Sequence, residues 1–188
     1  VRRRGARVLL EGENLLAAWP ARMREVRGTR VAMIFQEPMT ALNPVLTIGR
    51  QIEEVIEVHG AAPPAQRRQR VLDILAAVHL PDPGRIVHAY PHQISGGQRQ
   101  RAMIAMALVL GPQCLIADEP TTALDVTTQA QILKLIRDVQ RERGTAVLFI
   151  THDFGVVAEI AGRIAVMQSG RLGELGEARE GLVGPSPP

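Results

Sequence analysis

The sequence predicts an α/β fold: a mostly parallel β-sheet covered by helices, with a helical subdomain inserted into the chain. Over residues 111–175, short apolar segments alternate with helical patterns, which is typical of a parallel sheet. Residues 45–92 show helical periodicity and no strand signal, which indicates the helical insert. A chain of 188 residues is long enough to bury one core, so we expect a single domain.

The elements before the insert are short. Residues 8–10 are apolar and lead into a turn, and residues 31–35 form a second apolar strand. Pro38 and Pro44 disfavour a regular element in the loop that follows, because proline has no backbone N–H to donate. We therefore expect residues 1–44 to be a β region that ends in a loop.

Helices dominate residues 45–110. Thr47 is the expected N-cap of a first helix, Pro63 and Pro64 open a second, and an apolar third helix covers residues 97–110. In residues 111–175 we expect strands over 115–117, 146–150 and 164–167, and helices around 132–144 and over 154–161. Residues 176–188 are rich in glycine, proline and serine, which predicts a loose tail.

The third helix opens with Ser95-Gly96-Gly97-Gln98. Ser95 and Gln98 have the spacing of a capping box, which satisfies backbone N–H groups at a helix start. A capping box does not explain two glycines, since each costs roughly 1 kcal/mol relative to alanine inside a helix. A ligand that approaches the backbone closely would explain them, and a helix N-terminus suits an anion. We therefore expect a phosphate site at residues 95–98.

Two adjacent carboxylates, Asp118 and Glu119, follow the apolar strand that begins near Cys114. Parallel strands present functional groups at their carboxyl ends. Asp118 is therefore a candidate Mg²⁺ ligand, and Glu119 is a candidate for polarising an attacking water. The alternative interpretation is a charged loop start.

His152 and Gln36 occupy equivalent positions after other strands. His152 follows the strand over 146–150, and Gln36 follows the strand over 31–35. We expect both at the sheet edge that carries Asp118 and Glu119. A lone histidine is often structural, so the structural and functional interpretations of His152 both stay open.

The basic charge is concentrated near the N-terminus. The net charge is +3, and the first thirty residues carry eight arginines against three glutamates. The five aromatic residues do not group into a stacking platform, so we expect no nucleic-acid partner. No apolar run approaches the length of a membrane span, and the composition favours a cytoplasmic protein.

These motifs, in this order, resemble the nucleotide-binding domain of ATP-binding cassette (ABC) transporters, whose fold is of the P-loop NTPase type. Residues 94–98 are similar to the signature motif, residues 115–118 to Walker B and residues 122–125 to the D-loop. The resemblance implies ATP and Mg²⁺ as cofactors, Glu119 and His152 as catalytic residues, and Asp118 and Gln36 as Mg²⁺ ligands. The residues that it assigns to nucleotide binding are Gln36, Ser95, Gly96, Gly97, Gln98 and Asp125.

A narrower resemblance points to importers of dipeptides, oligopeptides and nickel. It rests on residues 35–44, which are similar to their Q-loop, and on residues 90–93 before the signature. It implies an ATP-hydrolysing subunit on the cytoplasmic face of the membrane that energises uptake. Its partners would be a second ATPase subunit, transmembrane permease subunits and a separate solute-binding protein.

One motif of that family does not occur in the sequence. The phosphate-binding loop G-x-x-x-x-G-K-[ST] needs a lysine, and the chain's single lysine, Lys134, lies in a helical pattern with no glycine before it. We therefore expect a single partial ABC ATPase domain over 1–188 that lacks Walker A and hydrolyses no ATP by itself. Two alternatives stay open: a non-catalytic remnant that binds a partner subunit, and a soluble ABC ATPase of DNA repair or translation.

Overall fold

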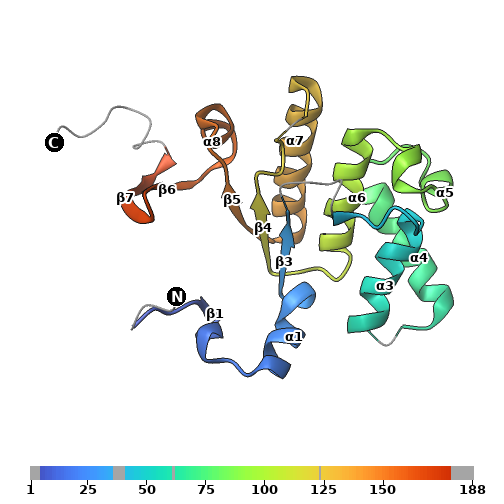
Figure 1. Cartoon of the computed structure of the whole chain (residues 1–188), viewed down its shortest axis with the longest axis horizontal. Helices are drawn as coiled ribbons and strands as arrows, with labels where there is room; N and C mark the ends of the chain where they lie inside the picture. The colour runs from blue at the N-terminus through green and yellow to red at the C-terminus, as the bar shows by residue number, and fades with distance from the viewer. Residues whose placement is uncertain (1–4, 36–40, 61, 123, 179–188) are drawn as a thin grey trace.

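The computed structural model describes residues 5–35, 41–60, 62–122 and 124–178. Its centre is a three-stranded parallel sheet in the order β3–β4–β5, formed by Val31–Ile34, Cys114–Asp118 and Ala146–Ile150 (Figure 1). Helix α7 (Val126–Arg143) connects β4 to β5. This arrangement confirms the predicted α/β class with a parallel sheet.

The helical insert lies to one side of the sheet (Figure 1). It contains α3 (Ile48–His59), α4 (Pro64–Ala77), α5 (Pro83–Ile86), the 3₁₀-helix η2 (Pro91–Gln93) and α6 (Gly96–Leu108). Thr47 caps α3 as predicted, because its hydroxyl accepts from the Arg50 backbone N–H over 3.3 Å. The described part of residues 45–92 contains no strand, as the periodicity predicted.

One apolar core joins the insert to the sheet. It takes fully buried side chains from the helices α3, α4, α6 and α7 and from the strands β3 and β4, among them Ile52, Leu75, Ile104, Leu115 and Ile136. Side chains alternate across a strand, so only one face of the sheet contributes to this core. The core therefore fixes α6 and α7 against β4, which carries the candidate carboxylates.

The opposite face of the sheet is apolar and open. Met33, Phe35, Leu148 and Ile150 alternate with the core residues along β3 and β5, and they are 39%, 56%, 54% and 43% exposed. Large exposed side chains that lie together on one surface are unusual for a folded domain. We refer to these four residues as the open sheet face.

Three elements differ from the sequence-based predictions. The helix α1 (Pro20–Thr29) was not predicted, and its pattern is interrupted by non-helical backbone at Arg27 and Gly28. The strand predicted over 164–167 does not join the parallel sheet within the described residues. Instead β6 (Arg163–Gln168) pairs antiparallel with β7 (Arg171–Glu177). The prediction of a loose tail from residue 176 is wrong for residues 176–178, since β7 reaches Glu177 and Ala178 is buried.

The remaining elements are small. A hairpin of β1 (Leu9–Leu10) and β2 (Glu13–Asn14) leads into the 3₁₀-helix η1 (Leu15–Ala17), and α8 (Phe154–Ile160) lies between β5 and β6. The predicted turn after residues 8–10 is thus confirmed, with a second short strand beyond it.

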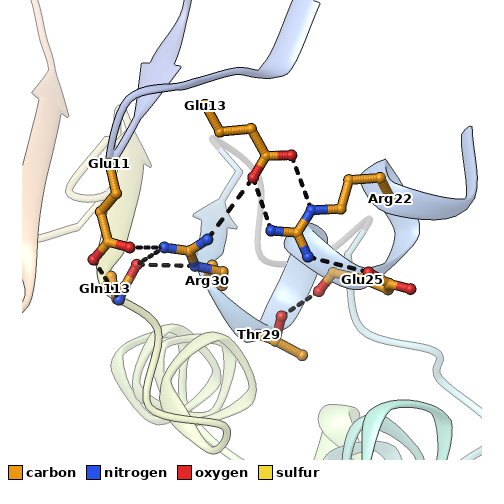
Figure 2. A network of polar contacts seen from close by, with 7 residues as sticks. All are labelled: Glu11, Glu13, Arg22, Glu25, Thr29, Arg30 and Gln113. Carbon is orange, nitrogen blue, oxygen red and sulfur yellow. Dashed lines mark hydrogen bonds and ion pairs between the residues drawn. The ribbon is translucent and has the colours of Figure 1, made fainter. Parts of the chain in front are cut away.

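A polar network fastens this hairpin to the amino-terminal end of the parallel strands (Figure 2). Arg30, just before β3, donates to Gln113 Oε1 over 3.1 and 2.9 Å and also pairs with Glu11. Gln113, just before β4, donates to Glu11 over 3.0 Å. Arg22 of α1 forms a two-pronged contact with Glu13 over 2.9 and 2.8 Å, which raises the pKa of Arg22. These contacts lie at the opposite end of the strands from Asp118 and Glu119.

Candidate functional site at the strand ends

Three of the predicted site residues meet at the carboxyl ends of neighbouring strands. β4 and β5 are in register, so that Asp118 pairs with Ile150. Glu119 follows β4 directly, and its backbone N–H donates to the Ile150 carbonyl oxygen over 2.9 Å. His152 lies just beyond the end of β5. The sheet therefore brings Asp118, Glu119 and His152 to one edge, as expected for parallel strands.

The Glu119 carboxylate is held at both of its oxygens. Nδ1 of His152 lies 2.6 Å from Oε1, and the His152 backbone N–H donates to the same oxygen over 3.2 Å. The Thr122 hydroxyl donates to Oε2 over 2.8 Å. The Glu119 side chain is 16% exposed, whereas that of His152 is 82% exposed. The carboxylate is thus fixed within the fold, while the imidazole lies in solvent.

These contacts shift both pKa values. Partial burial acts to raise the pKa of Glu119, but the hydrogen bonds from His152 and Thr122 outweigh it and lower that pKa from its ordinary value of 4.5. The hydrogen bond to Glu119 raises the pKa of His152 above its ordinary 6.5, and the charges of Glu119 and Asp153 add to the effect. At a pH between the pKa of Glu119 and the pKa of His152, the two side chains form an ion pair.

Asp118 is the candidate metal ligand at this edge. It is half-buried, and none of the other described residues bonds its carboxylate. A carboxylate without a protein partner fits Mg²⁺, which takes one or two carboxylates and keeps several waters. No group of three or more His, Cys, Asp or Glu side chains is close enough to hold a metal within the described ranges. Gln36, the second predicted ligand, lies outside the residues that the structure describes.

The turn at residues 95–98 begins α6 with the predicted capping box. The Gln98 backbone N–H donates to Ser95 Oγ over 3.3 Å, and the Ser95 backbone N–H donates to Gln98 Oε1 over 3.0 Å. The N–H groups of Gly96 and Gly97 have no partner within the helix, so these two remain available to an anion. This site therefore stays a candidate, with the capping box confirmed beside it.

The two glycines of this turn differ in their surroundings. A Cβ built on Gly96 would meet nothing within 4 Å, so the space above it is open. A Cβ built on Gly97 would lie 2.8 Å from Cγ2 of Thr128. The close approach that the sequence predicted at the glycines exists at Gly97, but the approaching group is a side chain of the same chain.

Asp125 caps α7. Its carboxylate accepts from the Thr128 backbone N–H over 3.0 Å and from the Thr128 hydroxyl over 2.7 Å. These two hydrogen bonds lower the pKa of Asp125. The nucleotide-binding role that the sequence suggested for Asp125 remains a prediction.

The candidate residues thus form two half-sites. The strand-end half-site consists of Asp118, Glu119 and His152, and the helix half-site consists of residues 95–98. Among the described residues, no hydrogen bond joins one half-site to the other. Each holds part of what phosphoryl transfer needs: one presents carboxylates for water and metal, the other presents backbone amides for phosphate.

Comparison with known proteins decides the family. The family model described as ABC transporter matches residues 3–122, which is more than half of the chain. The chain belongs to the ABC transporter family. This confirms the resemblance inferred from the sequence motifs.

Two curated relatives carry names that refer to peptide transport. A probable peptide ABC transporter ATP-binding protein of Sinorhizobium fredii is 54% identical over 98% of this chain and 55% of its own length. The dipeptide transport ATP-binding protein of Bacillus subtilis is 49% identical over 97% of this chain and 54% of its own length. The chain therefore spans about half the length of these curated relatives.

Solved structures of ABC proteins share the fold. A dimeric, post-hydrolysis structure of the ATP-binding cassette MJ0796 bound to ADP and Pi has a TM-score of 0.78 at 30% identity, covering 90% of this chain and 72% of that one. The structure of cbiO1 from Clostridium perfringens has a TM-score of 0.80 at 27% identity, covering 94% and 67%. These likenesses support the predicted ABC ATPase core.

Three residues shape the site in ways that the sequence did not predict, although Thr122 lies in the segment that resembles the D-loop. Thr122 binds Glu119, Thr128 contacts the Gly97 position, and Gln100 bonds the backbone after Glu119. Thr122 and Thr128 follow the carboxylate strand closely, which is a weak signal. Gln100 could have been noticed as a polar residue on the apolar helix α6.

Proposed function

We propose that this chain is an ATP-binding and ATP-hydrolysing subunit of an ABC importer that takes up peptides. The names of the relatives above refer to peptide and dipeptide transport, which favours peptides over nickel. Two further relatives, from Lactococcus lactis and Bacillus subtilis, are named as oligopeptide transport ATP-binding proteins. The proposal extends this solute class to the present chain.

The observation that carries the proposal is the separation of the two half-sites. Hydrolysis of ATP requires a phosphate cradle and a polarised water at the same place. Two chains placed head to tail would bring the strand-end half-site of one opposite the helix half-site of the other. The dimeric ADP- and Pi-bound structure of MJ0796 supports such pairing.

The residues of the strand-end half-site then have distinct roles. Asp118 and Gln36 would hold Mg²⁺, which supplies positive charge to phosphate oxygens when bound. Glu119 would accept a hydrogen bond from the attacking water at Oε2, which accepts from Thr122 alone and keeps a second lone pair, whereas Oε1 already contacts two His152 nitrogens.

The lowered pKa of Glu119 limits what it does while His152 is bound. A carboxylate that holds its charge tightly is a weak proton acceptor near neutral pH, so it orients the water more than it deprotonates it. If the exposed His152 ring bonded a phosphate of bound ATP in place of Glu119, the carboxylate would lose this hydrogen bond and become more basic. The pair thus gives a reason for Glu119 to gain basicity when nucleotide is present.

The proposed partners are a second ATPase subunit, transmembrane permease subunits and a separate solute-binding protein, with no nucleic acid. None of the helices that the structure describes has both the length and the apolar character needed to cross a bilayer. The proposed position of the chain, on the cytoplasmic face of the membrane and bound to its permease partners, is supported by the transporter names of its relatives.

The test uses the helix half-site. A full-length relative that hydrolyses ATP is inactivated at its aligned glycine turn and mixed with this chain, and phosphate release is measured. The wild-type chain should restore hydrolysis by supplying residues 95–98. Gly96→Asp should not, because a carboxylate would occupy the place of the phosphate. An acidic residue in a first helical turn favours the helix dipole, so folding should be unharmed.

Gly162→Asp is the matched control, since a Cβ at Gly162 also meets nothing within 4 Å and the residue lies outside both half-sites. It should restore hydrolysis like the wild type. Restoration by Gly96→Asp would refute the role of the helix half-site. No restoration by the wild-type chain would favour the second candidate function, a partner-binding chain without catalysis.

A further inference from the structure

Gln100 is a buried polar side chain on α6 that belongs to neither half-site. It is 1% exposed, and its Nε2 donates to the Pro120 carbonyl oxygen over 2.7 Å. A buried amide is costly unless its polar atoms are bonded. This bond therefore gives the Nε2 donor a partner and favours one arrangement of α6 against the loop after β4.

The bond reaches the backbone next to Glu119. Pro120 has no N–H, so its carbonyl is its one backbone hydrogen-bonding group. Glu119 has φ of +48°, in the left-handed region that residues with a Cβ rarely adopt. The Glu119 N–H donates to the Ile150 carbonyl oxygen, and the carbonyl oxygen of the next residue, Pro120, accepts from Gln100. Two bonds thus restrain a conformation that the chain would otherwise leave.

A second contact joins the same helix face to the same region. Gly97 lies three residues before Gln100, so both point to one side of α6. The Gly97 position is in close contact with Thr128, which in turn bonds Asp125. The packing of Gly97 against Thr128 and the hydrogen bond from Gln100 to Pro120 therefore hold α6 against the segment that follows β4.

We propose that Gln100 is a positioning residue whose bond to Pro120 couples the α6 turn at residues 95–98 to the orientation of the Glu119 carboxylate in the same chain. The inference deepens the proposed function and rests on it for its catalytic meaning, whereas the coupling itself needs no nucleotide. In a head-to-tail pair, the α6 turn serves one composite site and Glu119 serves the other. Gln100 therefore links the two sites through the body of one chain.

The test replaces Gln100 with methionine, which keeps the length of the side chain but removes the donor. Nuclear magnetic resonance then reads the ring and backbone nitrogen signals of His152 and the hydrogen exchange of the Thr122 amide. In Gln100→Met the His152 signals should move toward those of Glu119→Gln. Exchange at Thr122 should become about tenfold faster, the factor expected for loss of one buried hydrogen bond.

Gln51→Met is the matched control. Gln51 is also buried, at 5% exposure, and its Nε2 donates to the carbonyl oxygens of Asn43 and Leu46 over 3.1 and 3.0 Å. Its loss should weaken the fold in a similar way but leave the His152 and Thr122 signals unchanged. A shift of those signals in Gln51→Met as large as in Gln100→Met would mean that general loosening, and not positioning, is being measured.

Unchanged His152 and Thr122 signals in a folded Gln100→Met chain would overturn the proposal. If that variant does not fold, Gln100→Asn gives the same readings, because it keeps the amide but falls one methylene short of Pro120. These measurements need no nucleotide and no second chain. Failure of the proposed function would appear only in the mixed-chain hydrolysis assay, so the two failures are distinguishable.

Discussion

At the scale of single residues, the contact between Glu119 and His152 makes the strand-end half-site sensitive to pH. The pKa of Glu119 is lowered, so its contribution to stability is present above its unfolded value of about 4.5 and is lost as pH falls through the folded pKa. The pKa of His152 is raised, so its contribution is full below 6.5 and is lost as pH rises through the folded pKa. The ion pair therefore exists at pH values between the folded-state pKa of Glu119 and the folded-state pKa of His152.

Glu119→Gln should lower the pKa of His152 toward its ordinary value, because glutamine carries no charge to stabilise the imidazolium. The His152 ring resonances, followed during a pH titration, give this pKa directly. Glu159→Gln serves as control, since Glu159 pairs with Arg137 on the other side of α8 and does not contact His152. An unchanged His152 pKa in Glu119→Gln would contradict the observed pairing.

The residues of the site were predictable to different degrees. Asp118, Glu119 and His152 were identified because parallel strands place their following residues at one edge, and Ser95 and Gln98 because their spacing fits a capping box. The contact of Thr128 with Gly97 was not predictable, because it depends on how two helices distant in sequence pack. A glycine in a helix can indicate that another group approaches it closely, but the sequence does not identify that group.

At the scale of elements, the start of α3 is locked to the turn after α5. The Ile48 backbone N–H donates to the Ala89 carbonyl oxygen over 2.9 Å, and that of Gly49 donates to the Val87 carbonyl oxygen over 3.0 Å. A Cβ on Gly49 would lie 2.6 Å from that same carbonyl oxygen and 2.2 Å from Cγ2 of Val87. Glycine is needed here because backbone, which cannot turn aside as a side chain can, approaches it.

Gly49→Ala should therefore lower the free energy of unfolding by about 1–3 kcal/mol, the usual cost of overpacking. Urea denaturation followed by circular dichroism gives this value. Gly162→Ala is the control, because its Cβ would meet no atom within 4 Å, and it should change the stability little. Equal stability of the two variants would show that α3 moves away from Val87 without cost.

The elements themselves were mostly predictable. Thr47 and Pro64 mark real helix starts, and the strands that became β3, β4 and β5 were found within one or two residues. The pairing of β6 with β7 was not predictable. Gly173 and Gly176 interrupt the strand pattern of β7, so β7 was not recognised and β6 was assigned to the parallel sheet. Helix α1 was missed because its apolar pattern is weak.

At the scale of the whole molecule, the open sheet face leaves Met33, Phe35, Leu148 and Ile150 in contact with water. Such a surface binds hydrophobic probes. The purified 188-residue chain should therefore enhance the fluorescence of 8-anilinonaphthalene-1-sulfonate in its native state. Leu148→Lys should reduce this enhancement while leaving the circular dichroism spectrum unchanged.

Leu175→Lys is the control for this measurement. Leu175 is 58% exposed but lies on β7, away from the open sheet face, so its replacement should reduce the fluorescence less than Leu148→Lys does. Equal reductions would mean that the probe binds single exposed side chains and that the sheet face has no special affinity.

The order of strands in the central sheet has a consequence for how the chain reaches its fold. β4 and β5 are joined by a single helix, whereas β3 and β4 are separated by the entire helical insert. Closing the longer loop costs about 1 kcal/mol more chain entropy, so contacts between β4, α7 and β5 should form earlier during folding. β3 would then dock last, after the insert has collapsed. The residue that follows this late strand is Phe35, and Gln36, the proposed Mg²⁺ ligand, comes next in the sequence. The carboxyl end of β3 would therefore be the last part of the sheet to order.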